Sequence, residues 1–372
     1  MNKRKKLKIS AIVSGAEKNS FEYVIDSVIG DGANSIVYGA HYIDSDNGYH
    51  SVRLKECYPY TSNIKRLNDV LIWENEPQKR DDINKFKKAY HKLLDMQNNS
   101  NISNATAHTF DLIEANGTLY SVMDTTVGET FDKDKTSSLI DILKTIRALS
   151  KVVGEYHNNG YLHLDIKPSN FLTIPETREL VVLFDVDTVM PMADIPTGQI
   201  NCVPFSNNWA APEQMQGKII KLCPATDIFS IGAILFEKVM DRKFNNEDMA
   251  PFVNWNFQGE MFDKVNPKIK PLLSEIFHKT LSANIKRRFM SCDELIAVLD
   301  EAIKILVAGK PFIIGSCPAS LNNFIGRKQD IEEIPFLKQL RESIEYWEQK
   351  LKTATGKDVY KIKKTLIDLR KD

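Results

Sequence analysis

The stretch that decides the fold is YLHLDIKPSNFL, at residues 161–172. It follows a segment with helical periodicity and consists of loop residues set between apolar anchors. Within it Asp165 and Asn170 lie five residues apart, and VVLFDVD at 181–187 adds Asp185 at the end of a predicted strand. One aspartate can serve as a general base, whereas the asparagine and the second aspartate offer the oxygen ligands that Mg²⁺ prefers.

The chain around this stretch divides into a β-rich part and a helical part. Short β-rich runs separated by Gly, Asp and Asn turns extend from residue 21 to about 123, and one helical segment interrupts them at 81–96. From Ser138 onward the apolar spacing becomes helical, and Gly160 stands where a glycine would end the first helix. The expected strands are 21–30, 36–43, 50–57 and 117–124, and the further helices 225–240, 271–281 and 292–308. An α+β architecture follows, with a small β-rich lobe leading into a larger helical lobe.

A second signal is the glycine loop IGDGANSIV, at residues 29–37 between two predicted strands. Glycines let the backbone approach phosphates closely, although a Gly-x-Gly in a β-hairpin is usually only a turn. No predicted helix opens directly after it, which argues against a dinucleotide-binding fold. The next strand contains VRLK at 52–55 and places Lys55 on the inner face under this hairpin.

Taken in order, these segments resemble the protein kinase family over about residues 20–307. APE at 211–213, DIFSIG at 227–232 and Arg288 complete the series, and the pattern HxDxKPxN is particularly specific. Aminoglycoside-type phosphotransferases share the Asp and the Asn, but the Lys-Pro and the Ala-Pro-Glu are not expected in them. The nearest likeness is to bacterial serine/threonine kinases. The resemblance implies a bilobal kinase fold and an ATP- and Mg²⁺-dependent kinase that phosphorylates Ser or Thr hydroxyls of protein substrates.

The resemblance also implies a chemical role for each matching residue. Asp165 would accept the proton of the substrate hydroxyl, and Lys167 would neutralise charge on the γ-phosphate. Lys55 would pair with the α- and β-phosphates, while Asn170 and Asp185 would hold Mg²⁺. The implied ATP contacts are Gly30, Gly32, Ser35, Val37, Lys55, Met123, Asp124, Thr126 and Leu172, with Met123 as the gatekeeper.

Other matching residues have structural roles in the family. Glu213 would pair with Arg288, and Asp227 would pack under the catalytic loop. His163 is expected to be a packing residue that holds this loop, rather than a base.

Five positions depart from the family pattern. Ser35 replaces the third loop glycine, and Leu164 replaces the Arg of His-Arg-Asp, which removes the usual cationic partner of a phosphorylated activation loop. Asp187 stands where the metal motif has Gly and adds a negative charge beside Mg²⁺. Arg53 replaces a small residue beside the adenine, where it would crowd the base unless it pairs or extends into solvent. Ala89 stands where the family's helix has the Glu that orients the strand lysine.

The loss of this glutamate leaves two interpretations of function open. In an active enzyme, another acid or the phosphates alone would hold Lys55. The alternative is a pseudokinase that keeps the fold as a nucleotide-binding or scaffolding module. The acids available as substitutes are Glu56, Glu74, Glu76, Asp81 and Asp82.

Composition narrows the class of protein. Lys+Arg 49 against Asp+Glu 49 gives no net charge, which argues against a protein held to nucleic acid or a membrane by its global charge. The five cysteines are far apart, which excludes a disulfide scaffold and an ordinary zinc site and suits a reducing compartment. No apolar run approaches the roughly 18 residues that span a bilayer. A cytoplasmic protein is expected.

The ends of the chain differ from its centre. Residues 1–20 are expected to form a basic, solvated tail ahead of an N-lobe at 21–123 and a C-lobe at 124–308. Residues 309–330 read as a linker rich in Gly, Pro, Ser and Asn. Two apolar stripes at 331–372, broken by the turn TGKD, predict a helical hairpin or coiled coil. Its seam would mediate self-association or pack on another helical partner.

Overall fold

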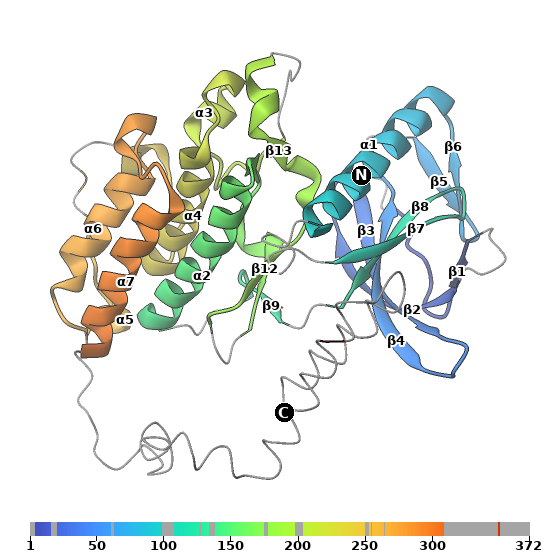
Figure 1. The fold of residues 1–372 in the computed structure, drawn as a ribbon, viewed down its shortest axis with the longest axis horizontal. Helices are drawn as coiled ribbons and strands as arrows, with labels where there is room; N and C mark the ends of the chain where they lie inside the picture. The colour runs from blue at the N-terminus through green and yellow to red at the C-terminus, as the bar shows by residue number, and fades with distance from the viewer. Residues whose placement is uncertain are drawn as a thin grey trace, which may run out of the picture. The chain divides into compact units, whose positions relative to one another are not determined.

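A six-stranded antiparallel sheet forms the β-rich part of the chain, in the order β1-β2-β3-β4-β8-β7 (Figure 1). The computed structural model describes residues 4–308 and residue 349, apart from 16–20, 61–62, 99–107, 126–127, 134–137, 175–177, 198–203, 250–252, 254 and 264. The strands are β1 (Ile12–Ser14), β2 (Glu22–Asp31), β3 (Ser35–Ile43), β4 (Tyr49–Cys57), β7 (Thr109–Ala115) and β8 (Thr118–Asp124). The four strands expected from the sequence correspond to β2, β3, β4 and β8.

One long helix, α1 (Glu76–Asn98), contacts β4, β7 and β8. It begins five residues before the predicted start at 81, because the side chain of Asn75 accepts a hydrogen bond from the Gln78 amide at 3.0 Å and caps the first turn. Leu93 and Met96 are its buried residues. The last turns therefore fix the helix against the rest of the fold.

A small hairpin that the sequence did not indicate lies between β4 and α1. Its strands are β5 (Ile64–Leu67) and β6 (Val70–Trp73), and Asn68 adopts a positive φ at the turn. Arg66 reaches from β5 to the buried carboxylate of Glu56, which also accepts hydrogen bonds from Tyr38 and Tyr120. Because both charges are fully buried and paired, this network anchors the hairpin to the sheet.

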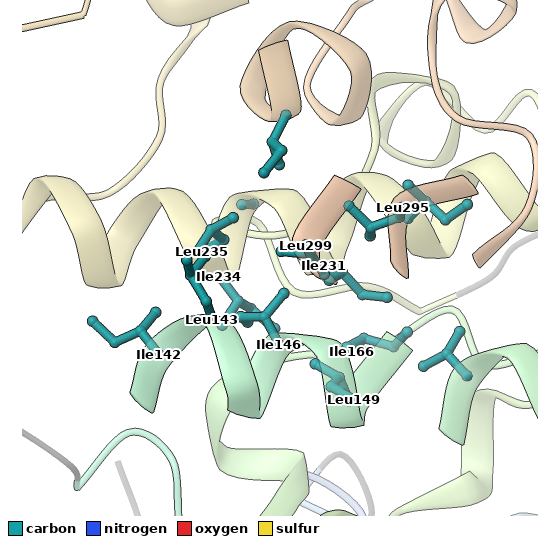
Figure 2. Close-up of a cluster of buried hydrophobic side chains, with 14 of the residues drawn as sticks. Ile142, Leu143, Ile146, Leu149, Ile166, Ile231, Ile234, Leu235, Leu295 and Leu299 are labelled. Atoms are coloured by element: carbon teal, nitrogen blue, oxygen red, sulfur yellow. The ribbon is translucent and has the colours of Figure 1, made fainter. Parts of the chain in front are cut away.

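The helical part is built around α2 (Leu139–Asn158), α4 (Pro224–Met240), α6 (Ile269–Thr280) and α7 (Cys292–Ala308). Ser138 caps α2, and Gly160 follows its end with φ +81°, as the sequence predicted. Figure 2 shows the apolar face of α2 pointing toward α4 and α7. The side chains that meet there are Ile142, Leu143, Ile146, Leu149, Ile231, Ile234, Leu235, Leu295 and Leu299.

One close contact between helices depends on a glycine. A Cβ atom at Gly232 of α4 would lie 2.4 Å from the Cβ of Thr280 in α6. Only a residue without a side chain allows the two helices to approach this closely.

Short elements connect the sheet to the helices. The strands are β9 (Glu129–Thr130), β10 (Tyr161–Leu162), β11 (Phe171–Thr173), β12 (Val181–Leu183) and β13 (Met190–Pro191). The short helices are α3 (Pro212–Met215) and α5 (Glu260–Asp263), and the 3₁₀ turns η2 (Pro168–Asn170), η3 (Val186–Thr188), η4 (Met192–Thr197), η5 (Ile219–Lys221), η6 (Asn246–Met249) and η7 (Ile285–Arg287).

The amino-terminal segment is not the solvated tail that its basic composition predicted. Arg4 and Leu7 are buried, and the hydroxyl of Tyr38 accepts a hydrogen bond from the Leu7 amide at 3.2 Å. Val13 in β1 is fully buried as well. The prediction of a solvated tail is therefore wrong for Arg4, Leu7 and Val13, which are buried, whereas Lys5, Lys8 and Ile9 are exposed as predicted.

The chain divides into two compact units, Met1–Gly309 and Lys310–Asp372. The predicted linker at 309–330 and the predicted hairpin at 331–372 lie outside the described residues, residue 349 excepted. The helical partner expected for that hairpin stays a prediction. Within the described residues, no helix combines the length and the apolar character needed to cross a membrane.

Candidate functional site

Lys55 lies at the centre of the site, on one of the two central strands of the sheet. In β4 it is paired with Val37 of β3 and Ser121 of β8. Its ammonium group donates to Asp185 Oδ1 at 3.1 Å and to Asp187 Oδ1 at 2.9 Å. Burial alone would lower the pKa of Lys55, but the carboxylates of Asp187 and Asp185 outweigh it and raise this pKa above its ordinary value.

Within the described residues, Lys55 forms no ion pair with any of the acids that the sequence offered as substitutes for the helix glutamate. Glu56 is paired with Arg66, and Glu74 is paired with Lys65. Asp82 accepts a hydrogen bond from Gln78 on α1, and Glu76 and Asp81 are exposed in the first turns of that helix. The structure therefore assigns the pairing to Asp185 and Asp187. The sequence pattern indicated Asp187 as a replaced glycine and an added charge beside Mg²⁺, and not as a partner of Lys55.

The catalytic loop brings three hydrogen-bond donors to one carboxylate. Asp165 accepts from the ammonium of Lys167 at 2.7 Å, from the hydroxyl of Ser206 at 2.7 Å and from the side-chain amide of Asn170 at 3.1 Å. Lys167 also donates to the Ser206 hydroxyl at 3.0 Å. Ser206 was not predicted. Its only signal in the sequence is a hydroxyl five residues before the Ala-Pro-Glu that begins at Ala211.

Asp227 holds the loop from below. Its buried carboxylate accepts from the backbone amides of His163 and Leu164, both at 2.8 Å, and from His157 Nε2 at 2.9 Å. Burial acts to raise the pKa of Asp227, but the contact with His157 outweighs it, so the pKa is lowered and the carboxylate stays charged. His163 is fully buried and packs near the Tyr156 ring, in agreement with the predicted packing role.

Leu164 occupies the position of the family's arginine with a positive φ of 65°. Its side chain is buried in a small apolar cluster, and Gln214 donates to its carbonyl at 2.6 Å. The other buried members of this cluster are Leu162, Met190, Ile195 and Leu222. Apolar packing, rather than a cation, therefore joins the catalytic loop to the segment after η3.

The expected structural ion pair is present. Arg288 donates to both carboxylate oxygens of Glu213, at 2.7 and 2.8 Å, and both side chains are buried. Thr226 donates to the same carboxylate at 2.9 Å. This pair connects α3 to the turn that precedes α7.

Pairing of β11 with β12 brings the two expected metal ligands to the same end of a short sheet. Asn170 precedes β11, Asp185 follows β12, and the Phe184 amide donates to the Asn170 carbonyl at 3.0 Å. Lys55 holds the pKa of Asp185 below its usual value, so this carboxylate is charged at neutral pH.

Their donor set fits Mg²⁺. The amide nitrogen of Asn170 is used on Asp165, which leaves its amide oxygen as the ligand atom. Within the described residues, no group of three or more His, Cys, Asp or Glu is placed to hold a metal. Two protein oxygens suit Mg²⁺, because this ion takes its remaining ligands from waters and substrate phosphates.

Most of the residues expected to contact the nucleotide lie on β2, β3, β4 and β8 of the six-stranded sheet and on β11 of a separate short sheet. Gly30 in β2 pairs with Val37 in β3, and Ser35 and Leu172 are buried. Met123 and Asp124 end β8, and Thr126 lies outside the described residues.

Arg53 belongs to the same six-stranded sheet, since it pairs with Met123 and lies two residues before Lys55 on β4. Burial lowers the pKa of Arg53, and the nearby carboxylate of Asp124 opposes this shift. An acid is therefore close enough to act on the charge of Arg53, and the expectation that this arginine pairs or extends into solvent beside the adenine stays a prediction.

A basic clamp holds the glycine loop. Arg4 donates to the carboxylate of Asp31, to the carbonyl of Gly32 and to the carbonyl of Tyr58, and its guanidinium lies 3.9 Å from the centroid of the Tyr60 ring. Burial would raise the pKa of Asp31, but Lys6 and Arg4 outweigh it and lower this pKa. The loop is thus fixed by a segment that precedes residues 20–307, over which the sequence resembles the kinase family.

Replacing Arg4 with alanine is expected to loosen the glycine loop. Three charge-assisted contacts are lost, which costs roughly 1–3 kcal/mol of unfolding free energy. Hydrogen exchange of the amides of residues 30–36 should become faster, and thermal unfolding should shift to lower temperature. Lys8→Ala is the matched control, because Lys8 is exposed. Equal exchange in the two variants would contradict the clamp.

Comparisons with known proteins agree with this geometry. A family model described as the protein kinase domain matches residues 72–297. The chain is similar to the serine/threonine-protein kinase PknA of Mycobacterium tuberculosis, at 26% identity over 50% of this chain and 44% of that protein. It is also similar to a probable serine/threonine-protein kinase of Clostridium perfringens, CPE1738, at 24% identity over 66% of this chain and 36% of that protein. The chain thus spans less than half the length of either relative.

Proposed function

We propose, because this chain belongs to the protein kinase family, that it is an ATP- and Mg²⁺-dependent serine/threonine kinase acting on protein substrates. The observation that carries the proposal is the assembly around Asp165. Its carboxylate accepts hydrogen bonds from Lys167, Asn170 and Ser206 within 3.1 Å. Lys55 and Asp185, which would meet the phosphates and the metal, are in contact with each other.

In this reaction Asp165 takes the proton of the substrate hydroxyl as its oxygen attacks. The bond between that oxygen and the γ-phosphorus forms while the bond from this phosphorus to the bridging oxygen breaks, and ADP leaves. Lys167 is already 2.7 Å from the Asp165 carboxylate, so its charge lies close to the attacking group. Lys55 binds the α- and β-phosphates and fixes the nucleotide.

Asn170 and Asp185 would hold Mg²⁺, which neutralises phosphate charge when bound. Asn170 is well placed for this task, because its amide nitrogen donates both to the Asp165 carbonyl at 2.9 Å and to the Asp165 carboxylate. The general base and the metal ligand are therefore positioned by the same pair of hydrogen bonds.

One observation favours a second candidate, a pseudokinase that binds nucleotide without transferring phosphate. Lys55 is paired with two carboxylates on one side of the site, and α1 has Ala89 where the family has a glutamate. If this arrangement misplaces the lysine, nucleotide would bind and no phosphate would move.

Purified protein incubated with Mg²⁺-ATP and a generic Ser/Thr protein substrate distinguishes the two candidates. The proposal expects transfer by the wild type, loss of transfer in Asp185→Ala, and unchanged transfer in Asp132→Ala, a control at an exposed aspartate. ATP binding by the wild type without any transfer would favour the pseudokinase. If neither binding nor transfer is detected, the proposal is wrong in both forms.

A further inference from the structure

The acid that contacts Lys55 most closely comes from the turn η3 and not from α1. Asp187 Oδ1 lies 2.9 Å from the Lys55 ammonium, and Asp185 Oδ1 lies 3.1 Å from it. The backbone around Asp187 is held on both sides. Val186 is buried, and the Thr188 hydroxyl donates to the His163 carbonyl at 2.8 Å. The carboxylate is therefore presented to Lys55 from a fixed turn.

The two acids are not equivalent once nucleotide is present. Asp185 is the carboxylate expected to ligate Mg²⁺, and a metal ligand has less electron density left for a nearby ammonium. Asp187 has no second task in the proposed reaction. It is the carboxylate that can continue to hold Lys55 while the phosphates and the metal are bound.

Helix α1 contributes a cation to the same place. Lys92 lies three residues after Ala89, on the same side of the helix. Its ammonium donates to the Val189 carbonyl at 2.6 Å, two residues after Asp187. Burial lowers the pKa of Lys92; the nearby Asp187 opposes this shift and the nearby Lys55 adds to it, so the three charged groups are neighbours.

We infer that Asp187 is the positioning residue for Lys55 and takes the role of the helix glutamate, whose position is occupied by Ala89. Lys92 then connects α1 to the segment that contains this acid. Relative to the family pattern, the acid lies in the turn after the expected metal ligand and not on the helix, and Lys92 on the helix donates to the Val189 carbonyl next to that turn. This inference rests on the proposed function for its kinetic test and not for its binding test.

Relocating the carboxylate tests the inference. The variants are Asp187→Gly, Asp187→Asn, the double variant Asp187→Gly/Ala89→Glu, and Asp187→Gly/Ala89→Gln as the control that matches the glutamate in size without its charge. ADP affinity is measured by calorimetry without divalent metal, and kcat, KM for ATP and the Mg²⁺ concentration for half-maximal rate are measured in the transfer assay.

Both single variants are expected to bind metal-free ADP more weakly and to lower kcat, each by about tenfold, the size of effect of one charge-assisted hydrogen bond. Ala89→Glu in the Asp187→Gly background should restore both quantities, and Ala89→Gln should restore neither. Rescue by a carboxylate on a different element would not occur if Asp187 served only the local fold.

Two results would overturn the inference. In the first, ADP affinity and kcat are unchanged in Asp187→Asn, which would mean that the contact with Lys55 has no role. Alternatively, Ala89→Glu could fail to restore activity while the half-maximal Mg²⁺ concentration rises, which would make Asp187 a metal ligand. If the wild type binds ADP but transfers no phosphate, the proposed function fails, and the ADP affinities of the four variants still decide the role of Asp187.

Discussion

Replacing Asp165 with asparagine is expected to lower the rate of phosphoryl transfer by about 10²–10⁴-fold, the usual contribution of a general base. The amide cannot take the hydroxyl proton. Its nitrogen would also face groups that donate to the native carboxylate, namely Lys167 and Ser206. The affinity for ATP should stay nearly the same, because Asp165 acts on the hydroxyl and not on the nucleotide.

The measurement compares single-turnover transfer and ATP binding in Asp165→Asn and in Asp132→Asn, a matched change at an exposed position. Phosphoryl transfer near the wild-type rate in Asp165→Asn would show that Asp165 is not the general base. A parallel loss of ATP affinity would instead indicate that the whole site had been disturbed.

Replacing Arg288 with methionine is expected to destabilise the fold by about 3–5 kcal/mol, because the carboxylate of Glu213 would remain buried without its partner. Arg288 also donates to the carbonyls of Ala225 and Ser282, so three segments lose a shared donor. Chemical denaturation gives the free energy of unfolding directly.

Arg287→Met is the control for this change, since the neighbouring arginine is exposed. Combining Arg288→Met with Glu213→Gln should recover part of the loss, because the neutral amide costs less to bury than the charge. Equal stability of Arg287→Met and Arg288→Met would show that the buried pair does not hold α3 in place.

The regular elements were predictable wherever their patterns were local. Helix α7 has the bounds that its apolar spacing predicted, and β2, β3, β4 and β8 lie where β-rich runs occur between turns. The hairpin of β5 and β6 was missed, because a buried arginine at its centre, Arg66, resembles a solvated residue until its partner Glu56 is known. Its partner lies on another strand, which no local pattern reveals.

In the site, too, contacts within one loop could be predicted and contacts between distant segments could not. Asp165, Lys167 and Asn170 lie within one loop, so their proximity follows from their spacing. The contact of Lys55 with Asp187 joins residues that are distant in sequence, and the resemblance to the kinase family indicated a partner on or before α1 instead. The burial of Arg4 was not predicted for a similar reason. A run of basic residues indicates a solvent-exposed segment, and the partners of Arg4, which are Asp31 and the carbonyl of Gly32, come close to it only in the folded chain.

The apolar cluster around Leu164 has a consequence for how the order of this segment responds to conditions. Leu164 packs with Met190, Ile195 and Leu222, where the family pattern has an arginine for a phosphorylated loop. The order of this segment then depends on the hydrophobic effect, which weakens on cooling and is little affected by moderate salt. Treatment with a phosphatase should leave the catalytic loop in place. We therefore expect the packing of this cluster to change with temperature more than with phosphorylation.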